Sequence, residues 1–257
     1  MNNTILKLAT FNCRNYKSNK NNVNNLANNN DITFICEHWL LESEQLIIKR
    51  NLPHHHVYLH ADESVKDRLG RGRPFGGFCW LIKKEFENIK FIMYNKSVSQ
   101  IIITRKNGNK INIFGVWLPY ENNSSENFEM LKNCFSIIEA ALDANKNEET
   151  FIMGDFNCDL HRGNRFDDVA RQFVNENKLV DCVGLFNQNV KFTYKKGEYK
   201  ASIDHILIYK SFQKNIECCV VGPCDNGSDH NYICLSCNME SNVKEIQNVE
   251  SKQVYVG

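Results

Sequence analysis

The chain has 257 residues, of which 42% are hydrophobic, and a formal net charge of +1 at pH 7. This length allows one large domain or two small ones, and the near-zero charge excludes a protein that binds nucleic acid over a uniformly basic surface. The sequence has neither an apolar N-terminal leader nor an apolar run long enough to cross a bilayer, so we expect a protein that is neither secreted nor membrane-bound.

Nine segments have the alternating or continuous apolar pattern of β-strands. In chain order they are 5–11, 32–36, 76–83, 98–104, 111–117, 151–153, 203–209, 216–221 and 232–236. The residues RKNGNK at 105–110 are typical of a hairpin turn. Strands therefore dominate the predicted secondary structure.

Apolar residues spaced by three and four predict two helices, over 128–142 and 166–174, and a weaker helix over 21–29. Because strands outnumber helices, two sheets packed face to face with helices outside them are expected. The apolar pattern stops after about Cys237. We therefore predict a domain over 1–238 and a polar linker or tail over 239–257.

The eleven cysteines are predicted to be reduced thiols, most of them packed in the core. Cys234 and Cys237 form a C-x-x-C pair, but a structural zinc site would need a second pair at suitable spacing. Cys218, Cys219 and Cys224 do not provide one.

Polar and ionisable side chains stand at the ends of five apolar segments. They are Asn12, Glu37, Asp155 with Asn157, Asp204, and Asp229 with His230. A single Asp or Asn after a strand is usually a turn residue, but five such ends in one chain favour a common site. Carboxylate oxygens suit Mg²⁺, and a histidine beside a carboxylate is held in a defined tautomer. This set of groups favours hydrolysis of a phosphoester.

The order of these groups over residues 8–236 resembles the endonuclease/exonuclease/phosphatase superfamily, with the motifs GDFN at 154–157, SIDH at 202–205 and SDH at 228–230. The segments CEHWL, GRPFGGFCWLIKK, GVWLPY, KFTY and SIDHIL are similar to the apurinic-type endonuclease domain of non-LTR retrotransposons. The resemblance implies that 1–238 is a catalytic domain with a four-layered α/β sandwich. Two packed mixed β-sheets would be flanked by helices, with the site at one rim.

The resemblance also implies a Mg²⁺-dependent endonuclease, with Mn²⁺ as an alternative ion. Such an enzyme nicks double-stranded DNA by phosphodiester hydrolysis and leaves a 3′-hydroxyl that primes reverse transcription of a retroelement. The implied partners are DNA and a reverse transcriptase fused in a longer polyprotein, and the implied location is the nucleus after synthesis in the cytoplasm.

The resemblance and the chemistry together assign roles to the polar residues. Glu37 is expected to be the principal metal ligand, with Asp229 assisting directly or through water. Asp155 would activate the attacking water, and Asn157 would hold that water or a phosphate oxygen. His230 would contact a non-bridging oxygen.

Two further residues are expected to position the others. Asp204 would orient His230, or form an ion pair within the sheet, and Asn12 would hold the neighbouring acids by hydrogen bonds. The residues expected to contact substrate are Arg14, Trp117, Tyr120, Thr193, Tyr194 and Ser228. The segment KFTYKKGEYK at 191–200 is predicted to be a hairpin whose lysines and tyrosines contact DNA, with a solvated charged hairpin as the alternative.

Two positions depart from the family pattern. Arg14 stands two residues after Asn12, where the wider family often has an acid, so the metal site is expected to depend mainly on Glu37. Trp117 stands where the family usually has Tyr, and an indole donates a hydrogen bond but cannot accept one.

These departures leave two alternatives open. One is another phosphoesterase of the superfamily, such as an RNA deadenylase or a phosphoinositide or sphingolipid phosphatase or phosphodiesterase. The other is a catalytically weakened relic that binds DNA.

Overall fold

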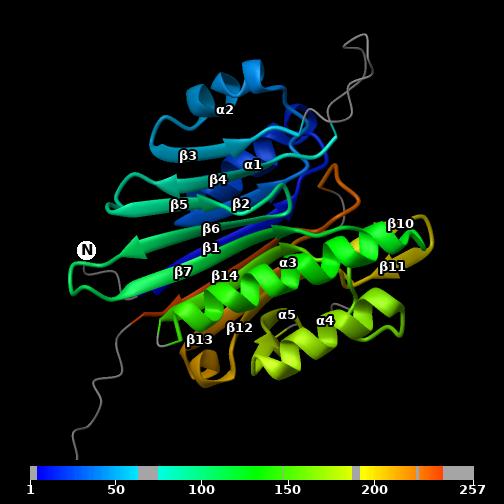
Figure 1. Ribbon diagram of the computed structural model, residues 1–257. Helices are drawn as coiled ribbons and strands as arrows, with labels where there is room; N and C mark the ends of the chain where they lie inside the picture. Colours follow the sequence, from blue (N-terminus) through cyan, green and yellow to red (C-terminus); the bar gives the residue numbers. More distant parts are fainter. Residues whose placement is uncertain (1–4, 63–74, 147, 187–191, 224–225, 240–257) are drawn as a thin grey trace, which may run out of the picture.

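Two six-stranded β-sheets packed face to face form the centre of the fold (Figure 1). The computed structural model describes residues 5–62, 75–146, 148–186, 192–223 and 226–239. Sheet A has the order β13-β14-β1-β2-β4-β3, with the bounds β13 Ile216–Val221, β14 Ile233–Asn238, β1 Ile5–Asn12, β2 Ile32–Cys36, β4 Phe78–Lys83 and β3 His55–His60. Sheet B has the order β5-β6-β7-β8-β12-β9, with the bounds β5 Ile89–Met93, β6 Val98–Thr104, β7 Lys110–Trp117, β8 Glu149–Asp155, β12 Asp204–Tyr209 and β9 Leu179–Asp181.

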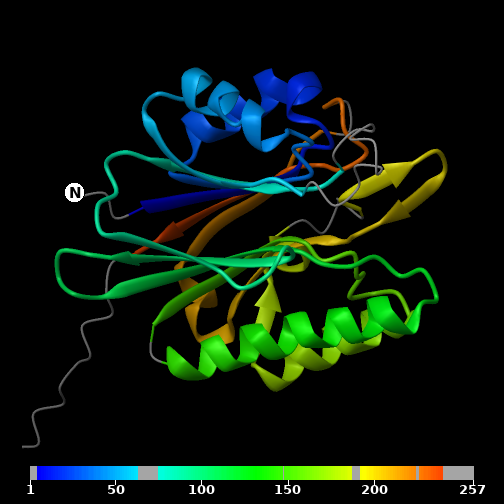
Figure 2. The ribbon, with the colours of Figure 1, turned by 45° about the horizontal axis from the view of Figure 1, so that its top comes forward.

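Helices cover the outer face of each sheet, which gives four layers (Figure 2). On sheet A lie α1 (Tyr16–Asn29) and α2 (Leu46–Asn51), and on sheet B lie α3 (Ser125–Ala144) and α4 (Arg165–Glu176). Short helices complete the chain, namely η1 (Glu42–Glu44), α5 (Cys182–Phe186) and η2 (Lys210–Asn215). The predicted four-layered α/β sandwich is confirmed.

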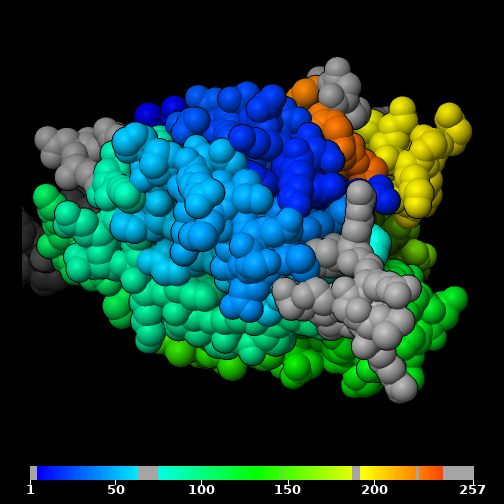
Figure 3. Space-filling model, turned by 90° about the horizontal axis from the view of Figure 1, so that it is seen from above, coloured from blue at the N-terminus to red at the C-terminus, as the bar shows by residue number. Residues whose placement is uncertain are grey.

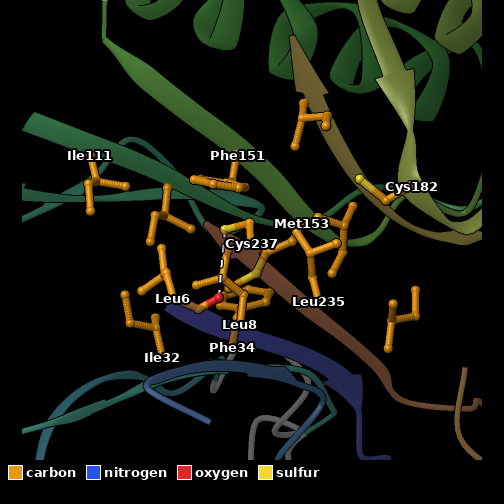
Figure 4. Packing of buried hydrophobic residues seen from close by; sticks show 14 of the residues in the cluster. Leu6, Leu8, Ile32, Phe34, Ile111, Phe151, Met153, Cys182, Leu235 and Cys237 are labelled. Carbon is orange, nitrogen blue, oxygen red and sulfur yellow. Dashed lines mark hydrogen bonds between the residues drawn. The ribbon is translucent and has the colours of Figure 1, made fainter. Parts of the chain in front are cut away.

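Three clusters of buried side chains hold the layers together. Between the sheets pack residues such as Leu8, Phe34, Phe151 and Leu235 (Figure 4). A second cluster joins sheet B to α3 and α4, and a third joins sheet A to α1 and α2. The described cysteines are free thiols, buried except for Cys218 and Cys234, as expected.

The strands that the sequence did not reveal are mostly edge strands. β3, β5 and β9 each lie at the edge of a sheet, where one side of the strand has no neighbour and a continuous apolar pattern is not required. β3 includes His55, whose Nε2 donates to the Ala27 carbonyl oxygen at 3.0 Å. Helix α1 begins at Tyr16, five residues before its predicted start at 21, because the buried ring of Tyr16 anchors a stretch of asparagines that have low helix propensity.

The segment 194–201 forms the predicted hairpin, with β10 (Tyr194–Lys196) paired to β11 (Tyr199–Ala201). It projects beyond one end of the two sheets (Figures 2 and 3). Figure 3 also shows α1 and α2 covering the outer face of sheet A. In the described part of the chain, no helix is both long and apolar enough to span a bilayer. Most of the predicted tail at 239–257 lies outside the described residues, so the division at 238 stays a prediction.

Candidate active site

The two parallel strand pairs of the fold deliver polar side chains to one rim of the sandwich. β1 pairs with β2 so that Asn12 lies opposite Cys36, the residue before Glu37. β7 pairs with β8 so that Trp117 lies opposite Asp155. β12 runs antiparallel to β8, and its first residue, Asp204, therefore also lies opposite Asp155. The strand ends thus meet where the sequence predicted a common site.

Asn12 joins two of the acids at this rim. Its buried amide nitrogen Nδ2 donates to Oε1 of Glu37 at 2.8 Å and to Oδ2 of Asp155 at 2.9 Å. Asn12 therefore holds both neighbouring acids by hydrogen bonds, as predicted from the sequence. The second oxygen of Asp155, Oδ1, accepts the backbone N–H of Asn157 at 2.9 Å. Both carboxylates are therefore held in one orientation.

Asp155, Asp204 and His230 form a buried group beneath the rim. His230 Nδ1 donates to Asp204 Oδ2 at 2.9 Å, and His230 Nε2 lies 3.9 Å from Asp155 Oδ2. Burial by itself lowers the pKa of His230, but the carboxylates of Asp204 and Asp155 outweigh it and raise this pKa to about 10. Burial raises the pKa of the Asp155 carboxyl, against the opposite effect of His230.

The same three residues offer ligand atoms that lie within 4.8 Å of one another, which is a candidate cation site by distance alone. An imidazolium has no free lone pair for a metal, however. The carboxylates of Asp204 and Asp155 favour the imidazolium form of His230 by raising its pKa, and its charge offsets part of theirs. The three side chains are therefore held together by charge and by the hydrogen bond from His230 to Asp204.

Glu37 fits a divalent cation better. Its Oε1 accepts the Asn12 amide, and its Oε2 accepts the indole N–H of Trp39 at 3.2 Å. Each oxygen accepts one hydrogen bond and keeps further lone pairs, and Glu37 lines the open cleft. Hard carboxylate oxygens of this kind suit Mg²⁺.

The segment that carries Glu37 has an unusual backbone. Glu37 and Trp39 have φ values of 53° and 52°, in the left-handed region that few side chains adopt. Their amides donate to the carbonyl oxygens of Gly77 and Gly76, at 2.8 and 3.1 Å. A Cβ on Gly77 would lie 2.6 Å from the His38 ring, so this pairing requires glycine. Strained backbone held by its surroundings is common at functional sites.

A cleft of about 1020 Å³ opens above these groups. Of the residues predicted for the site, nine line it, namely Arg14, Glu37, Trp117, Tyr120, Asp155, Asn157, Tyr194, Asp229 and His230. Asn12 and Asp204 are buried beneath it. The ring of Tyr194 lies edge-on to His230 with 4.8 Å between centroids, so the β10–β11 hairpin borders the cleft.

Two residues expected to contact substrate, Thr193 and Ser228, do not line the cleft. Thr193 has no exposed surface, and its hydroxyl oxygen accepts the amides of Ile203 and Asp204 at 3.0 and 2.9 Å. Ser228 donates its hydroxyl to the Asn12 carbonyl oxygen at 2.9 Å and accepts the His230 amide at 3.1 Å. Both hydroxyls therefore hold the backbone beside Asp204 and His230, and the expected contacts with substrate stay a prediction.

Sequence reasoning missed three residues that shape the site. Trp39 belongs to the segment CEHWL, but nothing in that segment predicted that its indole N–H would donate to Glu37. Asn19 donates to the carbonyl oxygens of Cys13 and Gly227, at 2.7 and 3.1 Å, and Asn226 donates to the His230 carbonyl oxygen at 2.8 Å. Asparagines are so frequent in this chain that nothing in the sequence distinguished these two.

Replacing Trp39 by Phe is expected to weaken the response to metal. The change keeps an aromatic ring but removes the N–H that orients Glu37, and loss of such a supporting hydrogen bond typically lowers metal affinity about 10-fold or more. Titration of Mn²⁺ by electron paramagnetic resonance measures the effect directly. Phe75→Leu is the matched control, because it changes a ring that packs against Trp39 and keeps the indole N–H. Equal Mn²⁺ affinity of wild type and Trp39→Phe would contradict the prediction.

His205 forms a buried ion pair behind the site. Its Nδ1 donates to Asp181 Oδ2 at 3.0 Å and its Nε2 to the Cys158 carbonyl oxygen at 2.9 Å. Burial by itself lowers the pKa of His205. The Asp181 carboxylate and the Cys158 carbonyl outweigh this effect and raise the pKa from 6.5 to about 9. The proton therefore stabilises the folded chain.

We expect the free energy of unfolding to fall as the pH rises from 6.5 to 9 because of this pair. The stabilisation is fully present below the unfolded pKa and is lost as the pH passes the folded pKa, by an amount on the order of 3 kcal/mol. Urea unfolding across this range tests the expectation. His205→Gln should flatten the pH dependence, whereas replacing the exposed His161 should not. An unchanged slope in His205→Gln would contradict the assignment.

The comparisons with known proteins agree with this geometry. Residues 9–230 match the endonuclease/exonuclease/phosphatase family, whereas no curated protein matches the sequence. An AP endonuclease from Archaeoglobus fulgidus has a similar structure, with a TM-score of 0.69, 15% identity, and coverage of 90% of this chain and 98% of that one. The 3′ phosphatase NExo from Neisseria, bound to a product DNA hairpin, has a TM-score of 0.69, 14% identity, and coverage of 90% and 98%.

The endonuclease domain of TRAS1, a telomere-specific non-LTR retrotransposon, has a TM-score of 0.65, 12% identity, and coverage of 92% of this chain and 100% of that one. At these identities the structural similarities establish the fold. The family match begins in β1 and ends at His230, so it spans the strand ends that build the cleft. The chain belongs to the endonuclease/exonuclease/phosphatase family.

Proposed function

We propose that the protein is a Mg²⁺-dependent endonuclease that nicks double-stranded DNA and leaves a 3′-hydroxyl, which primes reverse transcription of a retroelement. The observation that carries the proposal is the convergence of Glu37, Asp155 and His230 on one open cleft, with Asn12 bonded to both acids. Similarity to DNA-processing enzymes and to a retrotransposon endonuclease domain supports DNA as the substrate.

The reaction requires a water to attack phosphorus while the bond from phosphorus to the 3′-oxygen breaks. A divalent ion held by Glu37 would polarise a phosphate oxygen and offset charge on the departing 3′-oxygen. Asp155 accepts the proton of the attacking water, and its raised pKa improves it as a base at neutral pH. The Asn12 amide and the Asn157 backbone N–H keep its oxygens fixed during this transfer.

His230 stabilises the charge that develops on the phosphate. Asp204 holds Nδ1, which leaves the Nε2–H of the imidazolium for a non-bridging oxygen facing the cleft. Asn157 uses one N–H on the Leu118 carbonyl oxygen at 2.8 Å and keeps its other groups for the water or the phosphate. The water-derived oxygen remains on the 5′-phosphate, and the 3′-oxygen takes up a proton to become a hydroxyl.

The DNA backbone is proposed to run along the cleft past the β10–β11 hairpin. Lys195, Lys196 and Lys200 are exposed there, and Tyr199 accepts a hydrogen bond from the cleft-lining Arg162. Lysines in this place would neutralise phosphates without reading sequence. We also propose that the domain acts in the nucleus, joined to a reverse transcriptase.

A plasmid-nicking assay tests the function. Supercoiled DNA should become open-circular with Mg²⁺ or Mn²⁺ but not with EDTA, and a polymerase should extend the nicks without end repair. Parallel assays with poly(A) RNA, a phosphoinositide and sphingomyelin address the other phosphoesterase activities of the family. Cleavage of one of these substrates but not of DNA would overturn the proposal. DNA binding without any cleavage would instead identify a weakened relic.

A further inference from the structure

An arginine stands beside the acids of the cleft. Arg14 lines the cleft together with Glu37, Asp155 and Asp229. Its φ of 40° turns the chain immediately after β1, and its backbone N–H donates to Asn12 Oδ1 at 3.3 Å. The backbone of Arg14 is therefore fixed beside Asn12, and its side chain lines the cleft.

The Arg14 guanidinium forms an ion pair with the carboxylate of Asp229, which lies 215 residues away in sequence. Nη1 of Arg14 contacts Oδ2 of Asp229. The other oxygen of Asp229, Oδ1, is buried and has no hydrogen-bond partner among the described residues. Arg14 therefore contacts one oxygen of Asp229, and the other oxygen has almost no accessible surface, whereas Glu37 accepts only neutral N–H donors from Asn12 and Trp39.

The rest of the guanidinium remains available. The Arg14 side chain keeps 41% of its surface exposed, against 13% for Asp229. A guanidinium carries five N–H donors in a planar fork that matches phosphate oxygens, and the contact with Asp229 involves only Nη1. The remaining donors are fixed by this ion pair at the same cleft that holds Glu37 and His230.

We propose that Arg14 is a catalytic residue that supplies, at Asp229, the positive charge a second metal ion would otherwise supply. It neutralises Asp229 and donates to a non-bridging oxygen of the scissile phosphate, so that the site binds one divalent ion, held by Glu37. This inference rests on the proposed phosphodiester hydrolysis and replaces the expected role of Asp229 as a metal ligand.

Metal binding without DNA tests the first half of the proposal. Mn²⁺ titration followed by electron paramagnetic resonance should give one bound ion per chain in wild type and a large loss of binding in Glu37→Gln. Asp229→Asn should change the affinity less than about threefold. Arg14→Glu should create a second binding event, because an added carboxylate would then face Asp229. Two ions in wild type, or a loss of about tenfold or more in Asp229→Asn, would overturn the inference while leaving a metal-dependent nuclease intact.

Kinetics test the second half. Arg14→Ala should lower kcat/KM for nicking by about 100-fold, which is typical for loss of one charged donor to a transition state, and should leave the affinity of the ion at Glu37 and the thermal stability near wild type. Added guanidinium ion should restore part of the activity of Arg14→Ala, whereas Arg14→Lys should recover less than wild type because it lacks the fork. Arg50→Ala, on the exposed face of α2, is the control.

Full activity of Arg14→Ala, or no rescue by guanidinium when the variant is folded, would overturn the catalytic role. Absence of nicking in wild type would instead contradict the proposed function itself, so the two failures can be told apart.

Discussion

Gly154→Ala is expected to destabilise the fold by about 3 kcal/mol, which combines left-handed backbone strain with overpacking. Gly154 has a φ of 143°, and a Cβ built on it lies 2.0 Å from the carbonyl oxygen of Val116. Val116 is its partner in the parallel β7–β8 pair. The added methyl would therefore separate the two strands whose ends carry Trp117 and Asp155. Urea unfolding measures the loss directly.

A second glycine provides the matched control. Gly163 lies in the loop before α4, and a Cβ built there meets no atom within 4 Å. Gly163→Ala should therefore leave the free energy of unfolding close to wild type. If both variants unfold at the same urea concentration as wild type, the close approach at Gly154 does not determine the packing of this rim.

Asp155→Asn is expected to abolish nicking, with a fall in rate of about 1,000-fold, because an amide cannot accept the proton of the attacking water. The substitution keeps the size of the side chain, although one of the two donors that face it, Asn12 or Asn157, loses its acceptor. DNA binding in a gel-shift assay should stay near wild type. Plasmid nicking with saturating Mg²⁺ measures the effect.

Asp143→Asn is the control for this variant. Asp143 lies near the end of α3 with 73% of its side chain exposed, and it is not among the residues that line the cleft. The variant Asp143→Asn should nick DNA at the wild-type rate. A thermal stability of Asp155→Asn close to wild type would show that Asp155→Asn is folded. Nicking by Asp155→Asn at the wild-type rate would remove Asp155 from the mechanism.

The motif GDFN at 154–157 combines a structural glycine with two polar residues of the cleft. Glycine permits the close approach of β7 to β8, and the next residue, Asp155, then reaches the rim beside Asn12 and His230. Asn157 has a φ of 52°, which turns the chain so that its amide caps the Asp155 carboxylate. A short sequence thus encodes a close strand pair, a base and the turn that fixes the base.

Much of the fold followed from apolar patterns, because strands buried on both faces form continuous apolar runs. β1, β2, β4, β7 and β8 were predicted for this reason, and their burial is nearly continuous. β3 and β5 were missed because edge strands bury less: most of their side chains are only partly covered. Tyr16 was missed as the start of α1 because its burial depends on contacts from distant residues such as Asn51.

The sequence by itself determined which polar residues stand at the strand ends, because side-chain alternation and strand termini are local properties of the chain. Only the tertiary structure decided which of them face the cleft. Thr193 and Ser228 turn inward to hold Asp204 and His230, and Arg14 meets Asp229 across 215 residues. The direction of these side chains depends on the packing of two sheets and on left-handed backbone at Arg14 and Glu37, and no local pattern encodes either.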